Sequence, residues 1–134
     1  MKMGKINLRS LIIIIIMVML VAMENTSFAQ DKNLVVRIAR LQIDSMQLEN
    51  YKAALKIHAE TAVRVEPGVL TLYAVYEKDH PTHVTVFEIY ANADAYKAHL
   101  KTTHFTEYKT STKDMVKSLE LIETVPIALE TKGK

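Results

Sequence analysis

Residues 34–126 divide into six consecutive segments whose apolar side chains follow either a strand or a helix pattern, with turn residues between them. Four segments are rich in Val, Ile, Leu and aromatic residues and are typical of strands, namely 34–44, 69–78, 84–90 and 118–126. The other two, 48–65 and 93–115, show the three- and four-residue spacing of helices. This order, β-α-β-β-α-β, predicts an α+β ferredoxin-like fold, in which two helices cover one face of a four-stranded sheet.

The first helical segment carries one stripe of larger side chains at intervals of three and four residues: Leu48, Tyr51, Leu55, His58, Ala62 and Val65. Pro67 and Gly68 then end this helix. Asn92 is suited to cap the second helical segment, which Thr102 and Thr103 interrupt before the helical spacing resumes.

The second face of the predicted sheet cannot be wholly polar. The strand 69–78 places either Leu72 and Ala74 or Tyr73 and Val75 on it, and the neighbouring strand 84–90 is apolar at both of its central positions. An apolar sheet face is normally covered by a partner. We therefore expect a homodimer that packs sheet against sheet.

The N-terminal segment has the pattern of a secretory signal peptide. A 13-residue apolar run at 11–23 follows three basic residues and precedes a small-residue stretch that ends at Ala29. The run is shorter than the ~18–20 apolar residues that span a membrane. We expect residues 1–29 to be cleaved after Ala29 and residues 30–134 to act in the periplasm or as a secreted protein, without membrane attachment; the alternative is an uncleaved anchor.

Composition excludes several functional classes. Loss of the leader would leave 14 basic and 14 acidic residues, a balance that does not fit a nucleic-acid-binding protein. The sequence has no cysteine, so disulfides, thiolate metal sites and cysteine nucleophiles are excluded. Glycine-rich phosphate loops are also missing, since only three glycines occur in the whole sequence. We expect no cofactor.

Three short motifs between residues 66 and 108 point to a known family. They are EPG at 66–68, FEIY at 87–90 and AYKAHLKTTHFTEY at 95–108, and they resemble the antibiotic biosynthesis monooxygenase domain family. In that family the third strand carries Glu and an aromatic residue two positions later, and the next helix carries histidines and an aromatic residue. The matching positions here are Glu88, Tyr90, His99, His104, Phe105 and Tyr108.

The resemblance implies a dimeric α+β barrel of two ferredoxin-like subunits, each with its own pocket. Known family activities include oxidation of quinols and polycyclic phenols by O2 without flavin, haem or metal, haem cleavage, and isomerisation of small sugar-like signals. The haem-cleaving branch fits poorly. The sequence has no Trp, Lys109 stands near the position of the haem ligand, and the strand 34–44 has no Asn.

The resemblance implies that His99 or His104 is a catalytic base for a phenolic hydroxyl, because imidazole titrates near neutral pH. The two lie five residues apart, so a regular helix would direct them to different sides, and the break at Thr102 is needed for them to converge. The alternative is that one is a packed polar residue and the other lies near the surface. Glu88 could orient a histidine, or pair with an arginine of strand 34–44.

Aromatic and histidine side chains supply the expected substrate-binding residues: Tyr73, Tyr76, Tyr90, Phe105, Tyr108 and His58. Core or interface packing is the alternative use, and a satisfied buried histidine is the alternative for His58. Tyr73 and Tyr76 differ by three positions and should point to opposite faces of their strand. His80 and His83 flank a turn with no third ligand expected nearby, so we expect no metal site.

Together these features predict a cofactor-independent monooxygenase that oxidises a small hydroxylated, quinol-like aromatic with O2. Two alternatives remain open. One is a non-catalytic protein that binds a small hydrophobic ligand. The other is an isomerase of a small polar metabolite.

Overall fold

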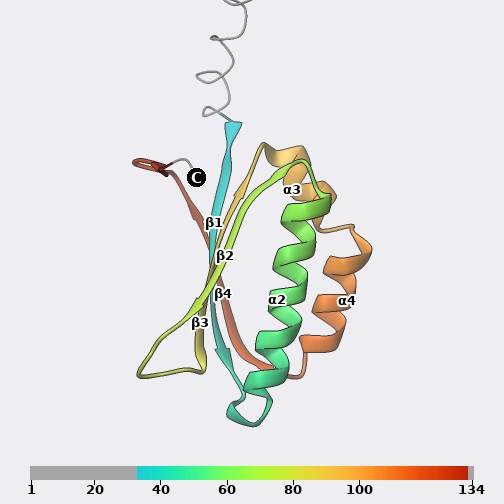
Figure 1. The fold of residues 1–134 in the computed structure, drawn as a ribbon, viewed down its shortest axis with the longest axis vertical. Coiled ribbons are helices and arrows are strands. Elements are labelled where there is room, and N and C mark those ends of the chain that lie inside the picture. The colour runs from blue at the N-terminus through green and yellow to red at the C-terminus, as the bar shows by residue number, and fades with distance from the viewer. Residues whose placement is uncertain (1–32, 133–134) are drawn as a thin grey trace, which may run out of the picture. The chain divides into compact units, whose positions relative to one another are not determined.

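The computed structural model describes residues 33–132 of the chain. The expected leader at 1–29 lies outside these residues. The elements follow in the order β1 (Val35–Ile43), the short 3-10 helix η2 (Ser45–Gln47), α2 (Leu48–Val65), β2 (Val69–Tyr76), β3 (His83–Tyr90), α3 (Ala93–His99), α4 (Thr103–Thr112) and β4 (Val116–Thr124) (Figure 1). Among the described residues, no helix combines the length and apolar character needed to cross a membrane.

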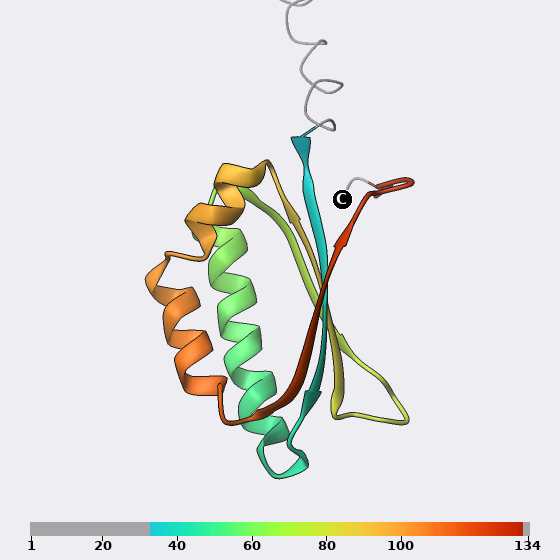
Figure 2. The ribbon, with the colours of Figure 1, turned by 180° about the vertical axis from the view of Figure 1, so that it is seen from behind.

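The four strands form one antiparallel sheet in the order β2-β3-β1-β4. Helices α2, α3 and α4 lie against one face of it (Figure 1), and Figure 2 shows the same layers from behind. This is the α+β ferredoxin-like arrangement that the sequence predicts, with the second helical segment divided into α3 and α4. Strand β4 begins two residues earlier than expected, because Ile43 pairs with Val116 beyond an irregularity in the register.

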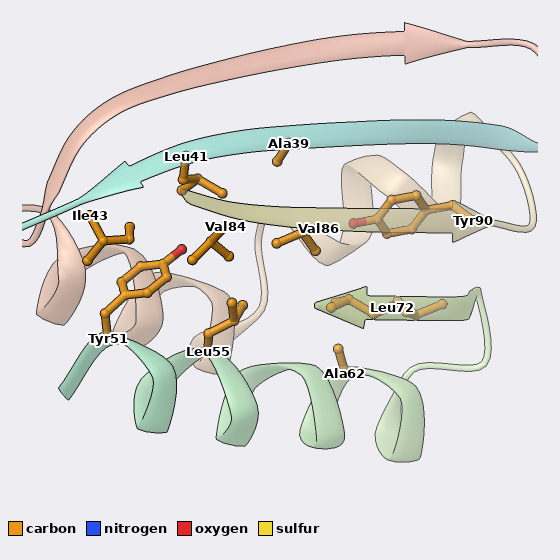
Figure 3. Close-up of a cluster of buried hydrophobic side chains, with 11 residues drawn as sticks. Ala39, Leu41, Ile43, Tyr51, Leu55, Ala62, Leu72, Val84, Val86 and Tyr90 are labelled. Carbon is orange, nitrogen blue, oxygen red and sulfur yellow. The ribbon is translucent and has the colours of Figure 1, made fainter. Parts of the chain in front are cut away.

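The hydrophobic core lies between α2 and the sheet. Figure 3 shows Leu55 and Ala62 of α2 pointing toward Leu72, Val84 and Val86 of the strands. All five side chains are buried. The predicted helical stripe is therefore the buried face of α2, except at its C-terminal end, where Val65 is exposed.

The face of the sheet away from the helices carries exposed apolar side chains. Tyr73 and Val75 are 63% and 61% exposed, whereas Leu72 of the same strand is buried against the helices. Of the two alternatives that the sequence leaves open, Tyr73 and Val75 are thus the pair on the uncovered face. We call this surface the open face.

Candidate active site

A cavity of about 100 Å³ lies between the sheet and the three helices. Six of the residues that the sequence singles out line it, namely His58, Glu88, Tyr90, His99, Phe105 and Tyr108. Most of the remaining wall is apolar. An apolar cavity of about 150 Å³ can hold benzene, so a space on the order of 100 Å³ is on the scale of a single ring rather than of a fused ring system.

The break between α3 and α4 brings the rings of His99 and His104 together, with 5.9 Å between ring centres, although only His99 lines the cavity. His99 ends α3, and Thr102 caps α4, where its hydroxyl accepts a hydrogen bond from the Phe105 amide at 3.3 Å. The same hydroxyl donates to the carbonyl oxygen of His99 at 2.8 Å. The chain turns at this point, so the two imidazoles, five residues apart in sequence, both reach Glu66.

Glu66 is the residue that joins the two histidines, and sequence reasoning missed it. It follows the last residue of α2, and its Oε1 lies 2.9 Å from Nδ1 of His99. Nε2 of His104 lies 2.7 Å from the same oxygen, without the angle of a hydrogen bond. Glu66 is the first residue of the EPG motif, and this motif was the sequence feature from which its place in the site could have been inferred.

The contact with Glu66 determines which nitrogen of His99 is free. A carboxylate only accepts hydrogen bonds, so Nδ1 of His99 carries the proton that is donated to Glu66. In the neutral ring, Nε2 then holds a lone pair. His99 is 1% exposed, and its Nε2 has no hydrogen-bond partner among the described residues. This nitrogen is a buried proton acceptor on a residue that lines the cavity.

His58 is buried among the other rings of the site. Its ring stacks on Tyr108, with 4.6 Å between ring centres and 8° between planes, and its Nδ1 lies 3.2 Å from Nδ1 of His104. Burial, together with the charges of His99 and His104, lowers the pKa of His58 to about 4. His58 is therefore neutral near pH 7.

Two tyrosines of the cavity, Tyr90 and Tyr108, have a raised pKa. Burial raises the pKa of Tyr90, and Glu88 nearby adds to this effect. Burial also raises the pKa of Tyr108, whose hydroxyl shares a 2.7 Å hydrogen bond with that of Tyr51. Neither phenol is a base at neutral pH, so both supply hydroxyl groups and aromatic walls.

Glu88 lines the cavity without an ion-pair partner. Burial raises the pKa of this carboxyl, and His99, the Tyr90 hydroxyl and Arg37 oppose the effect in part. Within residues 33–132, no basic nitrogen lies within 4.0 Å of Glu88. Arg40 instead pairs with Glu120 at 3.7 Å on the exposed side of the sheet. Of the two alternatives for Glu88, the structural bridge to an arginine of β1 is therefore not formed among the described residues.

Tyr73 and Tyr76 lie away from this cavity. Tyr73 is on the open face, and Tyr76, 52% exposed, contacts Lys52, whose Nζ lies 3.9 Å from the ring centre. The two rings are on opposite faces of β2, as their spacing predicts. The structure thus brings together every expected site residue except these two tyrosines.

The turn between β2 and β3 contains a third potential ligand that the sequence analysis did not anticipate. Oε2 of Glu77 lies 3.4 Å from Nδ1 of His80 and 3.3 Å from Nδ1 of His83. All three side chains are exposed. The expectation that no third group is near the two histidines is therefore wrong, because strand pairing returns Glu77 to the level of His83.

Comparison with known proteins agrees with this architecture. Residues 34–111 match the family model described as antibiotic biosynthesis monooxygenase. The crystal structure of a candidate antibiotic biosynthesis monooxygenase from Bacteroides thetaiotaomicron is 51% identical, with a TM-score of 0.74 over 78% of this chain and 99% of that chain.

Two further structures are more distant. A candidate monooxygenase from Lactobacillus acidophilus is 33% identical, with a TM-score of 0.68 over 72% of this chain and 45% of its own. A candidate monooxygenase from Fusobacterium nucleatum is 25% identical, with a TM-score of 0.72 over 78% of this chain and 48% of its own. No curated protein matches the chain. The family match covers more than half of the sequence, and the chain belongs to the antibiotic biosynthesis monooxygenase family.

Proposed function

We propose that the protein is a monooxygenase that oxidises a small, quinol-like hydroxylated aromatic with O2. The observation that carries this proposal is Nε2 of His99, which has no partner in the described part of the chain and belongs to a ring that Glu66 holds beside a cavity with aromatic walls. The cavity volume favours a single-ring substrate over a polycyclic one.

The reaction begins with proton transfer from a phenolic hydroxyl to Nε2 of His99. Glu66 stabilises the imidazolium that forms, because its carboxylate accepts the hydrogen bond from Nδ1. The phenolate then reduces O2. The substrate gains one oxygen atom and loses two hydrogens, which leave with the second oxygen atom as water. The apolar wall limits access of bulk water to the reactive anion.

The open face supports the second part of the proposal, which is a homodimer. Exposed Tyr73 and Val75 lie on the side of the sheet opposite to the helices and to the cavity. A second copy that packs there would cover apolar surface without blocking the site. The proposal also includes export, with residues 1–29 as a cleaved leader and a periplasmic or secreted mature chain.

Oxygen uptake with a panel of quinols and substituted phenols tests the activity. We expect uptake that is stoichiometric with product, and no product under anaerobic conditions. Unchanged turnover without O2 would contradict the monooxygenase and favour an isomerase. Saturable binding with no turnover of any compound would favour a ligand-binding protein, which the small, largely apolar cavity also suits.

A further inference from the structure

Arg37 is a buried cation in the wall of the cavity. It lies on the central strand β1, two positions before Ala39, and faces the helices as Ala39 and Leu41 do. Only 8% of the residue is exposed. A guanidinium is charged at every pH that a protein experiences, so this charge persists inside the cavity.

The described part of the protein places an aromatic ring beside this cation but brings no carboxylate within ion-pair distance of it, and Glu88 acts on it only from farther away. Cζ of Arg37 lies 4.5 Å from the ring centre of Tyr96. Glu88 and Glu123 stand opposite Arg37 on the two neighbouring strands, yet neither is within 4.0 Å of its nitrogens. Nε of Arg37 is buried and has no hydrogen-bond partner within residues 33–132.

An unpaired buried charge is costly, and a buried donor without an acceptor adds to that cost. Cζ of Arg37 lies over the Tyr96 ring, and the N–H groups of a guanidinium point outward in its plane. A planar anion such as a carboxylate can accept two parallel hydrogen bonds from that edge. The environment of Arg37 therefore lacks the group that such a ligand would supply.

Arg37 and His99 lie along one connected wall. Cζ of Arg37 lies over the ring of Tyr96, whose centre is 5.1 Å from that of Tyr90, and the ring centres of Tyr90 and His99 are 5.3 Å apart. Arg37 and His99 both line the cavity, so a ring bound in it can present an acidic group to one and a hydroxyl to the other. We propose that the substrate is a hydroxylated aromatic acid whose carboxylate binds Arg37. This inference rests on the proposed function and defines its substrate class.

The test is calorimetric titration of the protein under anaerobic conditions with two probes, 2,5-dihydroxybenzoate and its methyl ester. The probes share the quinol ring and differ in the anionic group. We expect the acid to bind at least about tenfold more tightly than the ester, as a charge-assisted hydrogen bond implies. Equal affinities in the wild-type protein, or no binding of either probe, would overturn the proposal.

Arg40 provides the matched control on the same strand, because its side chain is 63% exposed and pairs with Glu120. We expect Arg40→Gln to keep the preference for the acid and Arg37→Gln to lose it. Arg37→Lys keeps the charge but not the two-pronged geometry, so we expect an intermediate preference. A preference for the acid that survives in a folded Arg37→Gln variant would overturn the proposal.

The titration contains no oxygen, so it reports on Arg37 independently of oxidation. If the titration shows the preference for the acid but the separate oxygen-uptake assay shows no uptake, only the proposed monooxygenase activity is contradicted. If the assay shows oxygen uptake but the titration gives equal affinities for the acid and the ester, only the carboxylate proposal is contradicted.

Discussion

At the scale of single residues, His99 and Glu66 form a pair in which a carboxylate holds one imidazole nitrogen and the other has no partner among the described residues, which suits it to the proposed proton transfer. We expect His99→Gln to lower kcat by about 10²–10⁴-fold, the usual contribution of a general base. Glu66→Gln should lower kcat less and leave KM nearly unchanged, because Glu66 contacts the base and does not line the cavity. Steady-state kinetics by oxygen uptake measures both.

His83→Gln is the matched control for these two variants, because His83 is the exposed first residue of β3 and does not line the cavity. Its kcat and KM should equal those of the wild-type protein. A His99→Gln variant with wild-type kcat would remove His99 from the mechanism.

His58 makes stability depend on pH. Its pKa is about 4 in the folded protein and near 6.5 in the unfolded chain, so between these values the unfolded state binds the additional proton. The free energy of unfolding should therefore fall as pH drops from 6.5 to 4, by on the order of 2–3 kcal/mol. Urea unfolding at several pH values measures this, and His58→Phe should flatten the dependence while it keeps the stacking on Tyr108.

At the scale of elements, Thr102 controls the break between α3 and α4. Its hydroxyl caps α4 and also binds the carbonyl of His99. We expect Thr102→Ala to lower the free energy of unfolding by about 1 kcal/mol, as loss of a helix cap does. Thr103→Ala removes a neighbouring exposed threonine and should change stability by less than about 0.5 kcal/mol. Chemical denaturation compares the two, and equal losses would show that the cap has no special role.

Gly68 allows the start of β2 to lie close to α3. A Cβ at this position would collide with the Cβ of Ala95 in α3. We expect Gly68→Ala to destabilise the protein by about 1–3 kcal/mol, as overpacking does. The double variant Gly68→Ala, Ala95→Gly restores the space and should recover part of the loss in thermal denaturation. If the double variant loses more stability than the two single variants lose in total, this packing account is contradicted.

The order of the elements was predictable because it depends on local patterns. The helical stripe from Tyr51 to Ala62, the cap at Asn92 and the break at Thr102 are all set by neighbours a few residues away. The start of β4 at Val116 was not predictable, because it depends on how this strand pairs with β1. Which face of β2 meets the helices was also left open, since both alternating sets are apolar.

At the scale of the whole molecule, the open face should govern association. We expect Tyr73→Glu to convert the proposed dimer into a monomer, because it places a charge in the centre of the interface. Val63→Glu introduces the same charge on an exposed position of α2 and should leave the mass unchanged. Light scattering after size-exclusion chromatography measures the mass. A wild-type monomer would contradict the dimer.

Long-range contacts explain which parts of the site the sequence revealed. The residue types of His99, His104 and Glu88 were visible as motifs, but Glu66 is 33 positions from His99 and gains its role only when α2 and α3 meet. The hydroxyl of Tyr51 likewise reaches Tyr108 across 57 positions. Sequence reasoning therefore found the candidate histidines and Glu88 and missed the residues that contact the site side chains from far along the sequence.

Alternate side chains of β3 point to opposite faces of the sheet, so the strand contributes both to the cavity and to the open face. Val86, Glu88 and Tyr90 face the helices and the cavity, and Phe87 with Ile89 faces the other way. Substitutions on one set leave the other set in place, so the ligand specificity of a relative and its mode of pairing are free to evolve separately. A one-residue deletion within β3, by contrast, would exchange the two sets and disturb chemistry and association at once.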